Sequence, residues 1–379
     1  MIKSNPILFT IICVFSIQAI IFSGLILLKK PRIKTNTFLA LLVFFYALIP
    51  LNIVVVNVLK DYDLLYIFRY IQMEMLYGIG PTLYFYTKYI TNPKFKFERK
   101  HYLHFLPLVL EFIFYRTSIY RIGSDGLYLQ ELPTFSYVYL IQQWIGVISI
   151  LTYSFISLRI LVKYQKQLKE YYSKIDNISL KWLQTPIIIY ACYFILWQVL
   201  TEIDRFVFDR SLREHYFLPN FVLLSIATCW IGFKGYIQKE RELVFLKPFS
   251  KKSKSITIQK DEIFIKRLNL LMETKKPYLN PELNLSMLAE MLNIKPKVLS
   301  LKINQNYNQN FYDLINSYRV MAFKKRIESP KSDQLSLLGH AFESGFNSKS
   351  TFNKVFKEST QLTPSQYLKK NKNTSEKKR

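Results

Sequence analysis

The sequence contains few of the residues that most enzymes and metal sites use. Its 379 residues include three cysteines and four histidines, and Cys13, Cys192 and Cys229 are far apart inside apolar stretches. This spacing fits neither a zinc site nor a disulfide framework, so we predict buried free thiols and no metal. The sequence also contains no glycine-rich phosphate loop and no kinase or nucleotide-cyclase motif. We therefore predict that the chain is not an enzyme and holds no cofactor.

Acidic residues are scarce as well. The chain has 26 Asp and Glu against 52 Lys and Arg, a formal net charge of +26, although half of its residues are hydrophobic. A single soluble domain rarely combines these properties, so we expect an apolar part and a basic part. Residues 251–379 contain 25 of the basic residues but no apolar run long enough to cross a bilayer. Their charge favours binding to nucleic acid or to an anionic membrane surface.

Long apolar runs are confined to the first 237 residues. A spanning helix needs about 20 mostly apolar residues, and seven stretches fit this length approximately: 6–28, 37–58, 65–87, 102–117, 135–158, 184–203 and 216–236. The first is too long for a cleaved signal peptide, and no small-residue cleavage site follows it, so we predict that it is retained. We predict an all-α fold, with an N-terminal seven-helix transmembrane bundle followed by a helical C-terminal domain.

The charges of the loops predict the orientation of this bundle. The loops that follow the first, third, fifth and seventh stretches hold 19 Lys and Arg, whereas the other loops and the N-terminus hold 8. Positive residues stay on the cytoplasmic side. We therefore expect a multi-pass protein of the bacterial inner (cytoplasmic) membrane, with its N-terminus outside and its C-terminal domain in the cytoplasm.

Several amide and carboxyl side chains lie inside the predicted spans, where polar groups are costly and often functional. By the predicted topology they fall in the outer halves of their spans. They form a candidate signal pocket for an unknown ligand or ion: Gln72, Glu74, Glu111, Gln142, Gln143 and Gln198. The alternative is hydrogen bonding between helices that only holds the bundle together.

After a Ser- and Lys-rich linker, the pattern changes to short amphipathic helices. Apolar residues predict one short helix from Ser286 with Asn284 as N-cap, a turn at Asn293, and a second helix from Lys295 to about Gln305. A helix, a tight turn and a helix with a basic, amide-bearing face is what reading of the DNA major groove requires. The exposed candidates on this helix are Lys295, Lys297, Ser300, Lys302 and Asn304.

The pattern then repeats. A longer helix from Asn310 to about Glu328 leads to a second short helix, a turn centred on Gly345, and a helix from Lys349 to Glu358. Its DNA-binding candidates are Ser348, Lys349, Ser350, Asn353, Lys354 and Lys357. One such unit alone is a weak signal, but two in series predict a domain that places two recognition helices about one DNA turn, ~34 Å, apart.

The run AFESGFNSKSTFNKVFKESTQLTPSQYLKK, together with NFYDLINSYRV before it, resembles the DNA-binding domain of AraC-type (AraC/XylS) transcription regulators. The resemblance covers residues 283–370, and it implies two helix-turn-helix units gripping adjacent major grooves. Two positions depart from the family pattern. His340 stands where the family usually has Ile or Val, and Gln361 stands where Gly usually follows Thr360.

Together these features predict a membrane-tethered, sequence-specific transcription regulator whose transmembrane part senses a signal. The predicted domains are a sensor-like bundle at 1–237, a basic linker at 238–258, an AraC-type DNA-binding domain at 259–370 and a basic disordered tail at 371–379. The expected partners are promoter DNA, the lipid bilayer, RNA polymerase and an unknown ligand, with a homodimer left open. The alternative is a receptor or transporter-like bundle whose basic domain docks a protein partner or the membrane surface.

Overall fold

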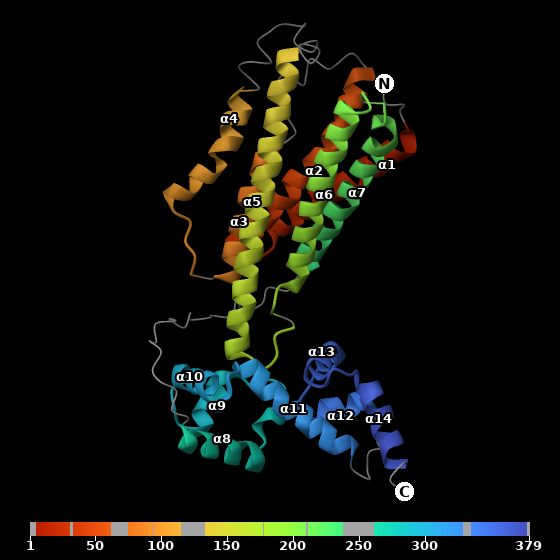
Figure 1. Cartoon of the computed structure of the whole chain (residues 1–379). Coiled ribbons are helices and arrows are strands. Elements are labelled where there is room, and N and C mark those ends of the chain that lie inside the picture. The colour runs from red at the N-terminus through yellow and green to blue at the C-terminus, as the bar shows by residue number, and fades with distance from the viewer. Residues whose placement is uncertain are drawn as a thin grey trace. The chain divides into compact units, whose positions relative to one another are not determined.

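The computed structural model describes residues 5–30, 33–61, 75–92, 94–114, 133–176, 178–209, 211–237, 261–328 and 335–376. Within these ranges all regular secondary structure is helical (Figure 1), as predicted, apart from one isolated bridge between Tyr172 and Asn284. The predicted linker, 238–258, lies outside the described residues. The chain divides into two compact units, residues 1–162 with 181–245 and residues 163–180 with 246–379.

The first unit contains the long apolar helices. Its helices are α1 (Pro6–Leu28), α2 (Lys34–Asp61), α3 (Leu76–Thr91), η2 (Arg99–Phe105), α4 (Leu106–Phe114), α5 (Pro133–Tyr171), α6 (Lys181–Phe206) and α7 (Arg213–Ile237). Many of the large apolar side chains of α1, α5 and α6 are exposed. An apolar outer surface of this kind is typical of helices that face lipid.

The prediction of seven spans is wrong for the described residues. Five helices are long and apolar enough to cross a membrane: Pro6–Leu28, Lys34–Val55, Leu140–Tyr171, Lys181–Phe206 and His215–Ile237. The described parts of the predicted third and fourth spans are short: α3 has 16 residues and α4 has 9. At 1.5 Å per residue these are about 24 Å and 14 Å long, less than the ~30 Å of a bilayer core. The rest of both stretches, up to Glu74 and from Tyr115, lies outside the described residues.

The α-helix of the fourth stretch begins later than predicted, at Leu106 instead of Tyr102, for a local reason. The chain from Arg99 to Phe105 forms 3-10 turns, and α4 begins only at Leu106. The backbone N–H of Glu98 donates to Nδ1 of His101 at 2.8 Å, which fixes the start of these turns. A count of apolar residues cannot distinguish 3-10 turns from an α-helix.

Glycines allow the helices of the first unit to approach closely. A Cβ at Gly80 of α3 would lie 2.4 Å from the ring of Tyr153 of α5, and one at Gly146 of α5 would lie 2.2 Å from Leu76 of α3. On α7, a Cβ at Gly235 would lie 2.6 Å from Leu39 of α2. Small residues at helix contacts are the usual means of packing helices inside lipid, where apolar burial gives no driving force.

The second unit consists of short helices. They are α8 (Glu262–Thr274), η5 (Pro277–Leu279), α9 (Leu285–Met291), α10 (Pro296–Tyr307), α11 (Phe311–Ile327), α12 (Leu337–Glu343), α13 (Lys349–Thr360) and α14 (Pro364–Glu376). Helices α8 to α11 enclose one apolar core, which includes Leu268, Leu288, Leu299 and Phe311. The rings of Phe323 of α11, of Phe346 in the turn, and of Phe352 and Phe356 of α13 pack together. Helix α14 runs to Glu376, into the segment predicted to be a disordered tail.

Candidate nucleic-acid interface

Helices α9 and α10 form the first predicted helix-turn-helix unit. The side chain of Asn284 caps α9 by accepting from the backbone N–H of Met287 at 3.0 Å. Asn293 has a φ of 52°, the left-handed conformation that the turn needs, and Asn accepts it more readily than most residues. Pro296 begins α10, where its fixed φ suits the first helical turn. The predicted cap, turn and helix start are therefore confirmed.

The candidates on α10 do not all share one side of the helix. Lys297, Ser300 and Asn304 are separated by three and four residues, so they lie on one face. Lys297 and Asn304 are exposed. The prediction that Ser300 is exposed is wrong, because its side chain is buried in this unit, with 4% of its surface exposed. Lys295 is the exposed N-cap residue. Lys302 points elsewhere, because its Nζ is paired with the Asp261 carboxylate at the start of α8 and lies 5.3 Å from the centre of the Phe264 ring.

The contact with Lys302 changes the acidity of its partner. The hydrogen bond from Lys302 and one from the backbone N–H of Phe264 lower the pKa of Asp261 below its usual value. Asp261 also caps α8, since its side chain accepts from that same N–H. Lys302 therefore links α10 to the N-terminus of α8, and its predicted role as a DNA contact is not tested by this geometry.

Helices α12 and α13 form the second unit. The Ser348 side chain caps α13 by accepting from the N–H of Thr351 at 3.2 Å. On one side of α13 Phe352, Val355 and Phe356 are buried. The other side is exposed and carries the predicted DNA contacts Lys349, Ser350, Asn353, Lys354 and Lys357. This helix therefore combines a buried apolar face with an exposed polar and basic face.

A buried arginine joins the two helix-turn-helix units. Arg319 of α11 is 2% exposed, and its guanidinium donates to the backbone oxygens of Tyr278 and Asn280, both at 2.9 Å. Burial lowers the pKa of Arg319 to about 10. Gly345, in the turn of the second unit, has a φ of 92°, and a Cβ there would lie 2.2 Å from the Tyr278 oxygen. The turn of the second unit thus rests directly on the backbone around η5 and on Arg319.

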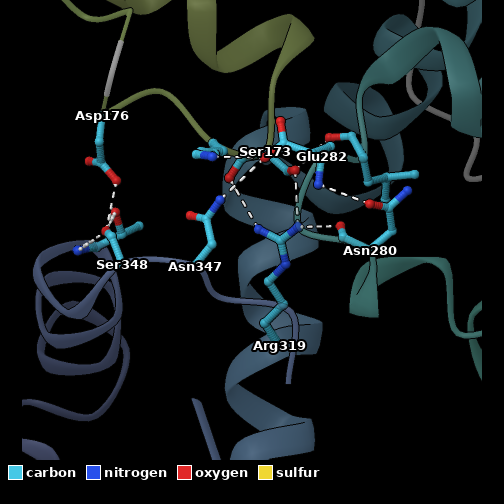
Figure 2. Close-up of polar contacts among 10 residues, drawn as sticks. Ser173, Asp176, Asn280, Glu282, Arg319, Asn347 and Ser348 are labelled. Carbon is cyan, nitrogen blue, oxygen red and sulfur yellow. Dashed lines mark hydrogen bonds and ion pairs between the residues drawn. The ribbon is translucent and has the colours of Figure 1, made fainter. Parts of the chain in front are cut away.

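Sequence reasoning missed one part of this unit, the segment 163–180. It comprises the last turns of α5 and the connection to α6, and we call it the α5–α6 segment. Its Glu170 carboxylate accepts from Ser300 and Asn304 of α10, both at 3.1 Å, and its Asp176 carboxylate accepts from Ser348 at 3.2 Å. Figure 2 shows Asp176 above Ser348, and Arg319 reaching towards Ser173 of the same segment. No signal in the sequence connects these residues, which are 130 or more positions apart.

The candidate signal pocket is only partly described. Gln72 and Glu74 lie outside the described residues. Nε2 of Gln142 donates to Glu111 Oε1 at 2.6 Å, and the hydroxyl of Tyr77 donates to the Gln142 backbone oxygen at 2.9 Å. Gln198 is instead bonded to Glu202, one turn further along α6, and Gln143 is half-buried on α5. The structure therefore brings Glu111 and Gln142 together and gives Gln198 a different partner.

The two departures from the family pattern are both accommodated. His340 is buried in α12, with 5% of its surface exposed. Gln361 ends α13 in the left-handed conformation with a φ of 60°. A glycine would adopt this conformation without the steric cost that a Cβ brings, so Gln361 costs some stability.

Comparison of the sequence with known protein families agrees with the helix-turn-helix geometry. Residues 288–370 match the family model of a helix-turn-helix domain of the AraC type. No curated protein and no solved structure matches the chain. Among the described residues, no group of three or more His, Cys, Asp or Glu side chains is placed to hold a metal ion. The C-terminal part of the chain therefore contains an AraC-type helix-turn-helix domain, which supports a DNA-binding regulator.

Proposed function

We propose that this chain is a membrane-anchored, sequence-specific transcription regulator. The observation that carries the proposal is the pair of helix-turn-helix units, in the second of which α13 presents an exposed polar and basic face. Base edges in the major groove are read by side chains such as Asn and Ser, and phosphates are held by Lys. Asn353 and Ser300 are the candidate base readers, and Lys357 and Lys302 are the candidate phosphate contacts.

The membrane anchor is supported by the five apolar helices of the first unit. Seven crossings and five crossings both leave the two ends of a chain on opposite sides, so the change in their number leaves the proposed orientation intact. The charge pattern supports a cytoplasmic position for the loop between α5 and α6. That loop belongs to the same compact unit as residues 246–379, which supports a cytoplasmic position for the DNA-binding domain in the inner membrane of a bacterium.

Helix α5 has the length that such a crossing needs. Its candidate span, Leu140–Tyr171, has 32 residues and is therefore about 48 Å long at 1.5 Å per residue. A bilayer core is ~30 Å thick. The final turns of α5 would then extend beyond the membrane on the cytoplasmic side, where Lys163, Lys166 and Lys169 lie. The proposed partners are promoter DNA, the bilayer, RNA polymerase and an external or membrane-borne ligand, and the chain is proposed to act without catalysis.

The direct test is a genome-wide map of the DNA bound by the tagged full chain in its own cells. We expect enriched sites that share a sequence motif. A matched variant with Ser350→Ala and Asn353→Ala changes only exposed residues of α13 and should lose the motif at equal membrane abundance. If wild type and variant recover the same background DNA, the proposed function is wrong.

A further inference from the structure

The α5–α6 segment contacts both recognition helices at residues that were predicted to bind DNA. Glu170 lies against Ser300 and Asn304 of α10, and Asp176 lies against the N-cap of α13, Ser348. Ser300 is 4% exposed, and its hydroxyl donates to Glu170. A hydroxyl that donates to this carboxylate cannot at the same time donate to the edge of a base.

The segment is held in this position by several further bonds (Figure 2). Ser173 is 1% exposed; its hydroxyl donates to the Leu283 backbone oxygen at 2.5 Å and accepts from Nη2 of Arg319 at 3.1 Å. Its backbone oxygen accepts from Nη1 of Arg319 at 3.3 Å. Lys174 pairs with Glu282 at 2.7 Å. The segment therefore docks on the junction of the two helix-turn-helix units as well as on the recognition helices.

The carboxylates of the segment accept the same kind of hydrogen bond that DNA would accept from these residues. Ser300, Asn304 and Ser348 donate their hydrogen bonds to carboxylate oxygens of the segment, as they would to phosphate oxygens or to acceptors on base edges. A carboxylate and a phosphate cannot occupy the same donors at once. Binding of the α5–α6 segment and binding of DNA are therefore mutually exclusive at these residues.

We propose that the α5–α6 segment is a built-in competitor of DNA, which holds the DNA-binding domain inactive until a signal in the membrane part withdraws it. This inference rests on the proposed function. The segment is continuous with α5 at one end and with α6 at the other, and both helices are candidate membrane spans. A ligand that favours another packing of these helices would shift the equilibrium between the docked and the released segment.

The alternative is that the segment is a permanent structural part of the DNA-binding domain and is never released. It carries four lysines, Lys163, Lys166, Lys169 and Lys174, which would favour contact with DNA phosphates if the segment formed part of the DNA-binding surface. Removal of its acidic contacts would then leave the affinity for DNA unchanged or weaken it. The two roles therefore predict opposite changes for the same substitution.

The first experiment removes the two acidic contacts. Full chains in lipid nanodiscs are titrated with a duplex library of random sequence at fixed salt, and bound sequences are selected and retested. Glu170→Ala with Asp176→Ala should tighten binding by between about 5-fold and 150-fold, the usual range of coupling between two sites. Because loss of two negative charges by itself strengthens DNA binding, the control is Glu262→Ala with Glu273→Ala, two exposed residues of α8.

The second experiment locks the segment. Tyr172 and Asn284 form an antiparallel bridge, so their Cα atoms are within the separation that a disulfide accepts. Tyr172→Cys with Asn284→Cys is made in a chain whose three native cysteines are replaced by serine. The oxidised protein should bind DNA at least about 5-fold more weakly than the same protein after reduction. The reduced sample reports any loss of folding caused by the substitutions.

The outcomes are separable. Equal affinity of the acidic-contact variant and its charge-matched control, or equal affinity of the oxidised and reduced proteins, overturns the competitor and leaves the proposed function standing. If neither wild type nor any variant binds duplex DNA, the proposed function fails and the inference fails with it.

Discussion

A few residues set the geometry of the DNA-binding domain, and Gly345 is the most constrained of them. Its φ of 92° lies outside the range that side chains readily adopt, and the Tyr278 oxygen occupies the place of a Cβ. Gly345→Ala must therefore strain the turn and also push the second helix-turn-helix unit away from η5. We expect a loss of roughly 1–3 kcal/mol in the local stability of α12 and α13.

Hydrogen exchange of the α12 and α13 amides in the full chain measures this loss. Gly339→Ala is the matched control, because Gly339 lies in α12 itself and a Cβ there meets Leu335 only at 3.3 Å. Equal protection in both variants would contradict the role given to Gly345.

At Gln361 the opposite substitution, to glycine, is expected to stabilise the protein. Its left-handed conformation costs a residue with a Cβ about 1–2 kcal/mol, and glycine avoids most of that cost. Gln361→Gly should slow hydrogen exchange in the last turn of α13, whereas Gln361→Ala should not. A stabilisation by alanine as large as that by glycine would show that the side chain, and not the backbone conformation, is responsible.

At the scale of helices, the face of α13 can be divided into contacts that position the protein and contacts that specify the sequence. We expect Lys357→Ala to weaken binding to all duplexes and to reduce the salt dependence by about one unit. Asn353→Ala should instead relax the preference at one base pair, at a cost of roughly 1–3 kcal/mol for the preferred sequence. Both side chains are exposed, so neither change should disturb folding. Equal losses on specific and random DNA would contradict the assignment.

At this scale the sequence predicted features that neighbouring residues determine, and it did not predict contacts between residues far apart in the chain. The caps at Asn284 and Ser348 and the turn at Asn293 follow from neighbouring residues, and the structure contains all three. Within the described residues the α-helices of the third and fourth stretches have only 16 and 9 residues, because apolar content alone does not reveal where a helix begins. The contacts of Glu170 with α10 were not predictable, because no local pattern links residues 130 positions apart.

For the whole molecule, the proposed orientation leads to a topology prediction. A reporter enzyme that is active only outside the cytoplasm should be silent when fused after residue 379. Fused between α6 and α7, in the short connection around residue 210, it should be active, since an even number of crossings separates this connection from the N-terminus outside. Activity at the C-terminus would overturn both the orientation and the proposed function, because DNA lies on the cytoplasmic side.

The second question at this scale is how a signal could pass from the candidate pocket to the DNA-binding domain. Helix α5 connects the two. This single helix carries Gln142, which is bonded to Glu111 at 2.6 Å, and near its other end Glu170, which is bonded to α10. Burial of polar groups among apolar helices is expensive unless these groups form hydrogen bonds. We therefore expect Glu111→Gln, which removes a charge but keeps an acceptor for Gln142, to change promoter output at unchanged membrane abundance.

A double-mutant cycle decides whether that change passes through the α5–α6 segment. In a chain that already carries Glu170→Ala and Asp176→Ala the segment no longer competes with DNA, so Glu111→Gln should have no further effect on output. Glu74→Gln, at a residue outside the described ranges, is tested in the same way. If Glu111→Gln alters output equally in both backgrounds, the pocket acts by another route. If output only follows membrane abundance, Glu111 and Gln142 serve to hold the bundle together, because a weaker helix contact lowers the amount of folded protein without altering its regulation.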